Sequence, residues 1–212
     1  MRLAVDIGGT FTDVVLENGE EQFSAKVLTT SADPGEGFLS GVGMVLKQAG
    51  ATPGDVDLIV HGTTLATNAL IERRGAKTAL LTTEGHRDAL EMAYENRFEQ
   101  YDIYIDRPTP LAPRYLRLPV RERLNKDGDV LVALDKASVE AAASIYRREG
   151  VESVAIGFLH SYANAAHEMQ AAEIISHALP GVSITLSSEV CPEIREYERF
   201  STACANAYVR PL

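Results

Sequence analysis

The sequence has 212 residues and a mass of 23.0 kDa, enough for one large domain or two small ones. Its formal net charge of −10 argues against nonspecific nucleic-acid binding, which needs a basic surface. No segment approaches the ~18 consecutive apolar residues of a membrane span, and the chain opens without a signal-peptide pattern. The two cysteines, Cys191 and Cys204, indicate no disulfide framework. We therefore expect a cytoplasmic protein with neither a nucleic-acid nor a membrane partner.

The first half of the chain predicts an α/β subdomain over residues 1–106. Three strands open it, over residues 2–7, 12–18 and 22–28. A helix, a strand, a second helix and a further strand follow, over residues 34–49, 57–60, 65–74 and 77–81. Asp33 and Gly50 are typical caps for the first helix, and Asn18-Gly19 is typical of a hairpin turn. The order βββαβαβ is that of a ribonuclease-H-like sheet, as in the N-terminal lobe of actin-like ATPases.

The remaining chain predicts a second, smaller α/β subdomain over residues 107–192. It begins with the proline-rich stretch 107–119, which cannot be helical. Strands are expected near residues 118–124, 130–133, 154–159 and 182–186. Helices are expected over residues 136–149, 165–178 and 193–208.

The end of the chain, residues 193–212, predicts a helix that leads to a further lobe. Its apolar side chains recur at helical spacing: Ile194, Tyr197, Phe200, Cys204 and Tyr208. Such a stripe needs a partner surface. We expect it to be partly exposed, or buried against a second copy of the chain. We interpret the sequence as the N-terminal part of a longer polypeptide that lacks its C-terminal lobe.

The segment Asp6-Ile7-Gly8-Gly9-Thr10-Phe11-Thr12-Asp13 has residue types suited to holding a polyphosphate and its metal. Asp6 follows a strand and is the predicted Mg²⁺ ligand, and we take Asp6 and Asp13 as the candidate catalytic residues. Glycine amides and threonine hydroxyls are predicted to bind phosphate: Gly8, Gly9, Thr10 and Thr12. The common G-x-x-x-x-G-K-[ST] and G-x-G-x-x-G signatures are absent from the sequence. An ordinary β-hairpin is the alternative.

A second candidate is His61-Gly62-Thr63-Thr64, between a strand and a helix. Free backbone N–H groups at a helix start can bind an anion, so we name Gly62, Thr63 and Thr64 as candidate phosphate-binding residues. Asn68, one turn into the helix, could face the same cleft, and we name it as a candidate for substrate contact. The alternative is a plain turn with a helix cap.

Four further residues are candidates for substrate contact. Arg87 could clamp a carboxylate or phosphate, and the neighbouring His86 could transfer protons. Glu189 and Glu193 lie near the start of the last predicted helix, where a carboxylate could be functional. The helix itself carries the pairs Arg195/Glu198 and Glu196/Arg199, which we expect on its solvent face.

Together these segments resemble the N-terminal region of the hydantoinase/oxoprolinase family. That family includes ATP-hydrolysing N-methylhydantoinases, 5-oxoprolinases and related β subunits of acetone carboxylases. The resemblance covers essentially the whole chain, and residues 6–13, 61–70 and 193–199 carry it most clearly. The first of these motifs is also shared with sugar kinases.

The resemblance implies ATP-driven opening of a cyclic amide, in which phosphorylation of the ring carbonyl oxygen makes it a good leaving group. It implies ATP and Mg²⁺ as cofactors, bound at the phosphate-binding residues and Asp6. It also implies a second lobe, or a partner subunit of the hydantoinase B type. The alternatives are an acetone-carboxylase-type β subunit, a sugar-kinase-like ATPase, and a non-catalytic module with an ATPase fold.

Overall fold

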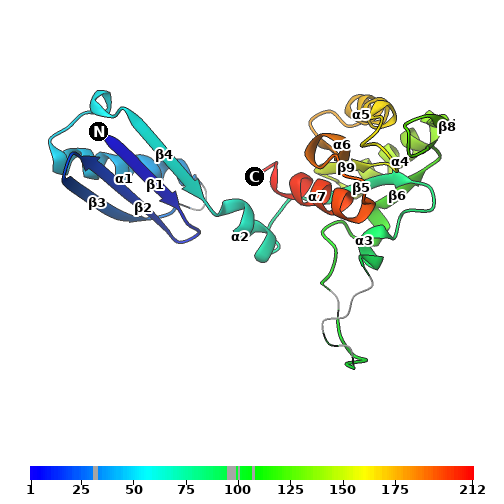
Figure 1. The fold of residues 1–212 in the computed structure, drawn as a ribbon, viewed down its shortest axis with the longest axis horizontal. Coiled ribbons are helices and arrows are strands. Elements are labelled where there is room, and N and C mark those ends of the chain that lie inside the picture. The colour runs from blue at the N-terminus through cyan, green and yellow to red at the C-terminus, as the bar shows by residue number, and fades with distance from the viewer. Residues whose placement is uncertain (31–32, 95–98, 100, 107) are drawn as a thin grey trace. The chain divides into compact units, whose positions relative to one another are not determined.

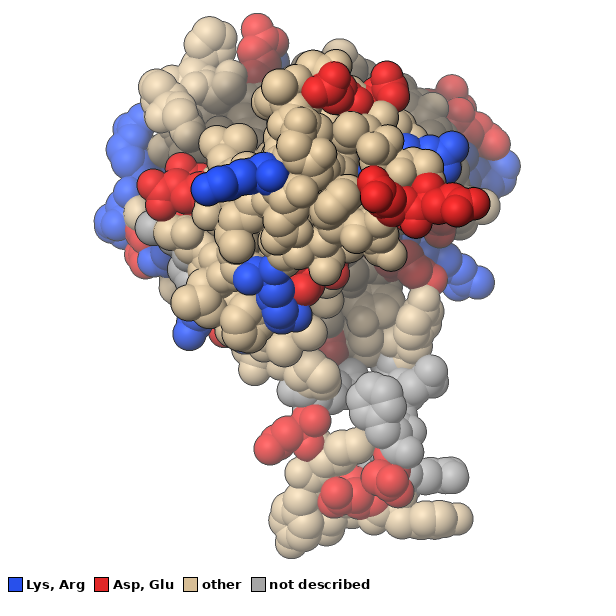
Figure 2. All heavy atoms as spheres, turned by 90° about the vertical axis from the view of Figure 1, so that its left-hand side faces the viewer, with Lys and Arg blue, Asp and Glu red and all other residues tan. Residues whose placement is uncertain are grey.

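The computed structural model describes residues 1–30, 33–94, 99, 101–106 and 108–212. These residues form two compact units, Met1–Arg74 and Gly75–Leu212 (Figure 1). Acidic and basic side chains are interspersed over the face that Figure 2 presents, with no extended basic area among the described residues there. None of the described helices is long and apolar enough to cross a membrane.

The first unit is a four-stranded sheet covered on one face by a helix. The strand order is β3-β2-β1-β4, with bounds Glu21–Leu28, Phe11–Asn18, Arg2–Ile7 and Leu58–Thr63. Strand β1 is antiparallel to β2 and parallel to β4. Alternate residues of β1, namely Leu3, Val5 and Ile7, are buried in a core that includes Val45 of helix α1 (Pro34–Ala49). The intervening residues of β1 therefore face away from α1.

Helix α1 has the predicted caps. The Asp33 side chain accepts a hydrogen bond from the Gly35 amide at 2.9 Å, and Pro34 occupies the first turn. Gly50 ends the helix in the left-handed conformation, with φ of 61°. The 3-10 turn Pro53–Asp55 follows and leads into β4. Helix α2 (Leu65–Ile71) comes after β4 and ends before the predicted position 74.

The second unit is built on a four-stranded parallel sheet of order β10-β9-β5-β6. The strand bounds in that order are Ser183–Leu186, Ser153–Gly157, Thr78–Thr83 and Arg117–Val120. A separate two-stranded sheet pairs β7 (Arg123–Leu124) with β8 (Val130–Val132). Three longer helices surround the main sheet: α4 (Lys136–Glu149), α5 (Ala166–Ala178) and α7 (Glu196–Val209). The short elements are α3 (Ala89–Met92), the 3-10 turn Arg114–Leu116 and α6 (Ser187–Val190).

Both faces of the parallel sheet are buried. Leu81 and Ile156 belong to a core cluster that includes Tyr146 of α4 and Ile175 of α5. Leu80 and its neighbours on the other face belong to a second cluster, formed with α7. The second unit is therefore layered helix–sheet–helix, the usual solution for a parallel sheet.

The α/β fold class and the chain order βββαβαβ are as predicted, but the last strand of that series lies in a different sheet. Strand β5 pairs with β6 and β9 rather than with the strands of the first unit. All six of its residues are buried, so it needs cover on both faces, which the second unit supplies. The division predicted at residues 106 and 107 consequently falls inside the second unit, and Arg107 itself lies outside the described residues.

The predicted partial exposure of the apolar stripe holds for Tyr197, which is half-buried, but is wrong for the three residues that follow it. Phe200, Cys204 and Tyr208 of α7 are 0%, 2% and 7% exposed. Phe200 and Cys204 belong to a core cluster of the second unit, and the Tyr208 ring lies against Gly75 of the same unit. The helix also begins at Glu196 rather than near 193, and α6 precedes it. Phe200 and Cys204 pack on the face of the parallel sheet that α4 and α5 do not cover, so their partner surface lies within the same chain. Ile194, which lies before the helix, is 68% exposed.

Candidate functional site

The turn between β1 and β2 offers free backbone donors. The Gly8 amide donates to the Phe11 carbonyl at 2.9 Å and closes the turn. Among the described residues, no hydrogen bond is made by the amides of Gly9 and Thr10, and both residues are at least partly exposed. These two amides, and not that of Gly8, are therefore available to an anion. Neither glycine has a positive φ, so the turn does not depend on a left-handed backbone.

Two carboxylates stand opposite each other beside this turn. Asp6 of β1 is paired across the sheet with Asp13 of β2 and, on its other side, with Gly62 of β4. All three lie on the face of the sheet away from α1. A methyl group added at Gly62 would lie 3.6 Å from Asp6 Oδ1, so the missing side chain leaves space beside this carboxylate. Asp13 forms an ion pair with Lys26 at 3.0 Å. Like charges directly opposite in a sheet are unfavourable unless a cation lies between them.

The two sequence motifs meet through Asn68. A methyl group added at Gly9 would lie only 2.8 Å from Asn68 Nδ2, so the α2 side chain reaches the β1–β2 turn. The same Nδ2 donates to Thr64 Oγ1 at 3.3 Å. Thr63 joins them from the other side, because its hydroxyl donates to the Ile7 carbonyl at 3.3 Å and accepts from the Leu65 amide. The structure thus brings together the residues of the two predicted phosphate motifs.

Thr12 is the exception within the first motif. Its side chain is 0% exposed and lies on the α1 face of the sheet, opposite to Asp6 and Asp13. Its hydroxyl is 2.9 Å from that of Thr29, which in turn donates to the Gly8 carbonyl. The predicted contact between Thr12 and phosphate is wrong, because strand alternation turns this residue into the core. Thr12 instead supports the turn from behind.

Of the predicted substrate residues, Asn68 lies in the first unit beside the β1–β2 turn, and the other four lie in the second unit. His86 follows β5, and its Nε2 is 3.2 Å from Arg123 Nη1. Arg87 is half-buried, and its Nε has no hydrogen-bond partner among the described residues. Glu189 in α6 and Glu193 after it are exposed, and neither lies at the start of α7.

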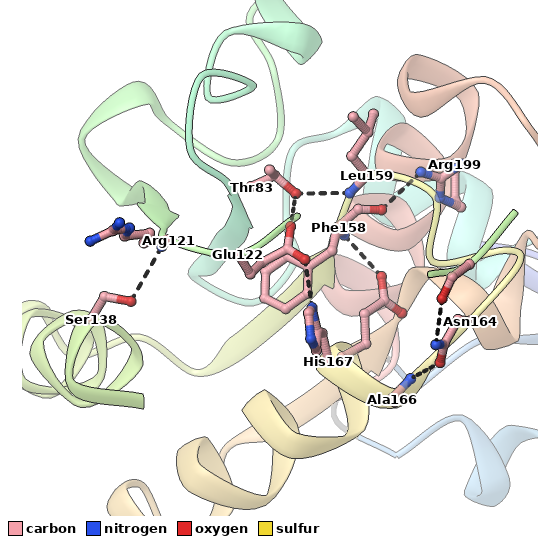
Figure 3. Close-up of polar contacts among 12 residues, drawn as sticks. Thr83, Arg121, Glu122, Ser138, Phe158, Leu159, Asn164, Ala166, His167 and Arg199 are labelled. Carbon is pink, nitrogen blue, oxygen red and sulfur yellow. Dashed lines mark hydrogen bonds and ion pairs between the residues drawn. The ribbon is translucent and has the colours of Figure 1, made fainter. Parts of the chain in front are cut away.

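A buried polar network that we did not predict occupies the carboxyl edge of the parallel sheet (Figure 3). Thr83, the last residue of β5, donates its hydroxyl hydrogen to Glu122 and accepts from the Leu159 amide at 2.8 Å. Glu122 Oε2 lies 2.8 Å from His167 Nδ1. Each of these side chains is almost fully buried. The sequence contained an indication of this network, because Thr83, Glu122 and Leu159 each lie at or just after the end of a strand.

A second part of the network centres on Glu168, which is 0% exposed. Its carboxylate accepts from the Phe158 amide at 3.0 Å and from the hydroxyls of Ser187 and Ser188, both at 2.6 Å. Arg199 donates to the Phe158 carbonyl at 2.9 Å and to the carbonyl of Glu193. Arg199 was predicted on the solvent face of its helix, but it is fully buried. Its backbone carbonyl partners replace the expected partner Glu196.

The first unit presents two carboxylates on an exposed sheet face and two free amides in the adjoining turn, a combination that suits a cation with its phosphate. The second unit presents the buried polar network instead. No group of three or more potential metal-ligating side chains occurs among the described residues. The protein alone therefore does not form a closed metal cage at the two carboxylates.

The mixed α/β fold is consistent with the actin-like ATPase class. Comparison with known proteins is more specific. Residues 2–179 match the family described as the hydantoinase/oxoprolinase N-terminal region. The chain belongs to the hydantoinase/oxoprolinase family.

Three relatives illustrate its range. Caprolactamase subunit alpha of Pseudomonas jessenii is 38% identical over 100% of this chain and 31% of its own length. Acetophenone carboxylase gamma subunit of Aromatoleum aromaticum is 34% identical over 97% of this chain and 30% of its own. The 5-oxoprolinase of Saccharomyces cerevisiae is 28% identical over 100% and 19%.

The fold agrees with a solved relative. The crystal structure of the ATP-dependent caprolactamase from Pseudomonas jessenii matches with a TM-score of 0.87 and 38% identity, over 100% of this chain and 32% of that one. The chain thus spans about a third or less of the length of these relatives.

Proposed function

We propose that this chain provides the phosphate-binding part of an ATP-dependent enzyme that opens cyclic amides. Two relatives are named for such substrates, caprolactam and 5-oxoproline, and one of them is described as ATP-dependent. The observation that carries the proposal is the contact between Gly9 and Asn68. It joins two separate motifs beside a pair of opposed carboxylates and two unpaired amides.

The residues present fit Mg²⁺ and a phosphate chain. Mg²⁺ commonly takes one or two protein carboxylates and completes its shell with water and phosphate oxygens. Asp6 would hold it, with Asp13 opposite, and a cation there would relieve the repulsion between the two. The Gly9 and Thr10 amides would donate to phosphate oxygens, and Thr64 retains a hydroxyl hydrogen for the same purpose. We assign no phosphate contact to Thr12.

ATP, when bound, supplies the phosphoryl group that converts an amide oxygen into a leaving group. The described residues then have three tasks. Asp6 and Asp13 hold the cation in place, the turn amides stabilise the negative charge of the phosphates, and Asn68 keeps the turn against α2. In the second unit, His86 and Arg87 remain our candidates for substrate contact. Glu189 and Glu193 remain weaker ones, since their side chains are exposed.

We further propose that a second lobe, or a partner subunit of the hydantoinase B type, completes the enzyme. Two relatives are named as subunits of larger assemblies, which supports this. A cytoplasmic location is part of the same proposal, supported by the two free cysteines, Cys191 and Cys204.

A ketone carboxylase is the second candidate, favoured by the likeness to acetophenone carboxylase gamma subunit. ADP release by the protein, together with its partner subunit, separates the possibilities. We expect release to depend on a ring amide, tested with caprolactam, 5-oxoproline and a hydantoin. Release only with a ketone plus bicarbonate would favour the carboxylase, and release with a hexose would favour a kinase. Release that depends on none of them would indicate a module with no catalytic role of its own.

A further inference from the structure

Four polar side chains converge at the carboxyl edge of the parallel sheet, in the second unit. His86 follows β5, Arg123 opens β7 just beyond β6, and His160 and Tyr162 follow β9. We call these four residues the edge cluster. All four are partly exposed, and Arg123 and His160 directly follow Glu122 and Leu159 of the buried network in sequence. Ligands of open α/β sheets bind outside the carboxyl ends of the strands.

The edge cluster carries positive charge without a matching acid. Arg123 donates to His86 Nε2 at 3.2 Å, and within the described part of the chain it forms no ion pair. A guanidinium that donates to an imidazole nitrogen requires that imidazole to be neutral. Burial, and then the charge of Arg123, hold the pKa of His86 below its ordinary value. The same two causes, with Arg199 added, lower the pKa of His160.

Two acids face the cluster, Glu122 and Glu196, and neither forms an ion pair with Arg123 among the described residues. The charge of Glu122 opposes the lowering of both imidazole pKa values without reversing it. Its carboxylate accepts a hydrogen bond from Thr83 and lies against His167. Glu196 at the start of α7 acts in the same direction, and no ion pair joins it to Arg123 among the described residues. Electrostatically, the cluster therefore retains an unfilled place for negative charge.

The backbone holds the cluster in a defined geometry. His160 has a φ of 60°, a left-handed conformation that is unusual for a residue other than glycine. The Ala163 amide donates to its carbonyl at 3.0 Å, and Tyr162 OH lies 3.4 Å from its Nδ1. The guanidinium carbon of the buried Arg199 is 5.5 Å from the centre of the Tyr162 ring. Backbone strain of this kind is concentrated at ligand clamps and active sites.

We propose that the edge cluster binds an oxyanion, either a carboxylate or a phosphate group. Arg123 would bind two oxygens side by side, with imidazole N–H groups and the Tyr162 hydroxyl as further donors. A carboxylate would come from an amino acid produced by ring opening, and a phosphate from a phosphorylated substrate. The site is formed by the second unit alone and does not require that ATP binds at Asp6.

Histidine titration by NMR tests this on the 212-residue chain. The pKa values of the imidazoles are measured in acetate, in inorganic phosphate and in chloride at equal ionic strength. We expect acetate or phosphate to raise the pKa of His86 and His160 by about one unit relative to chloride, because an adjacent anion favours the charged imidazole. His177, exposed in α5, serves as the internal control and should not respond. An effect of acetate alone identifies carboxylate as the ligand, and an effect of phosphate alone identifies phosphate.

Arg123→Gln should abolish the anion-dependent rise, whereas Arg121→Gln should leave it intact. Arg121 is exposed, and the hydrogen bonds seen for it in the described part of the chain are made by its backbone, to the Ser138 hydroxyl and from the Asp135 amide. Asp6→Asn should not alter the rise, which separates this site from the proposed ATP site. If Arg123→Gln perturbs folding, Tyr162→Phe replaces it and should weaken anion binding several-fold. Equal pKa values in all three salts, or a rise that persists without Arg123 or the Tyr162 hydroxyl, would overturn the proposal.

Discussion

Asp6 is the residue whose role is most open to test, because its side chain is exposed and contributes little to the core. We expect Asp6→Ala in the complete enzyme to abolish Mg-ATP turnover while circular dichroism and thermal unfolding stay near normal. The reason is that losing the carboxylate removes a cation ligand and not a packing contact. Glu20→Ala, an exposed change in the β2–β3 turn, is the matched control. Turnover within about tenfold of the unmodified enzyme, a barrier change of only ~1.4 kcal/mol, would refute the metal role.

Gly9 is constrained by a neighbour and not by its backbone conformation. A side chain there meets Asn68 Nδ2 at 2.8 Å, although φ is not positive. We therefore expect Gly9→Val to displace Asn68, block the approach of phosphate and lower ADP affinity, without changing the pH dependence of binding. Gly54→Val is a suitable control, because a methyl group there comes no closer than 3.8 Å to other atoms. Calorimetry gives the dissociation constants, and an unchanged value for ADP would reduce the turn to an ordinary hairpin.

The placement of the first motif beside one turn could be predicted because it depends on local structure. Asp6 and Gly9 are neighbours in one hairpin, and strand alternation needs no knowledge of the rest of the fold. The same alternation shows why Thr12 was misassigned, since the prediction counted hydroxyls without asking which face they occupy. The burial of Arg199, in contrast, could not be predicted from local sequence. Its partner, the Phe158 carbonyl, lies far away in sequence and meets it only through the packing of α7 on β9.

Among the elements, helices with local caps were predicted well. Asp135 and Gly150 delimit α4 as expected, because a cap is a contact between residues a few positions apart. The sheet partner of β5 was not predictable in this way. A fully buried strand fits between any two apolar neighbours, and only the tertiary structure shows that these are β6 and β9.

The contact between α7 and β9 gives a stability prediction. A methyl group added at Gly157 would lie 2.5 Å from the ring of Phe200, inside a fully buried layer. We expect Gly157→Ala to destabilise the second unit by about 1–3 kcal/mol, the usual cost of overpacking. Gly43→Ala, at an open helical position, should instead be stabilising by about 0.5–1 kcal/mol. Urea unfolding measures both, and equal stability of the Gly157→Ala variant would mean that α7 does not pack on β9 in this way. Partial recovery by an added Phe200→Leu change would confirm the contact as the cause.

For the molecule as a whole, our proposal assigns phosphate donors to this chain and the apolar slot for the adenine ring to the second lobe. Nucleotide pockets gain most of their affinity from such apolar enclosure. We expect residues 1–212 to bind Mg-ATP weakly and to show no amide-dependent hydrolysis. Calorimetry with ATP and an assay for ADP release examine the two points on one sample. Tight micromolar binding by the chain alone would contradict this expectation and would place a complete nucleotide site within it.

The pairing of Asp6 with Asp13 has a consequence for folding as well as for binding. Within the described part of the chain only Asp13 has a lysine partner, so the native hairpin brings together charges that the unfolded chain keeps apart. A ligand that binds the native state but not the unfolded one stabilises the native state by mass action. In our proposal the cation is such a ligand, and the β1–β2 hairpin then becomes more resistant to opening as free magnesium rises. Free magnesium would then raise the stability of the first unit even before any nucleotide binds.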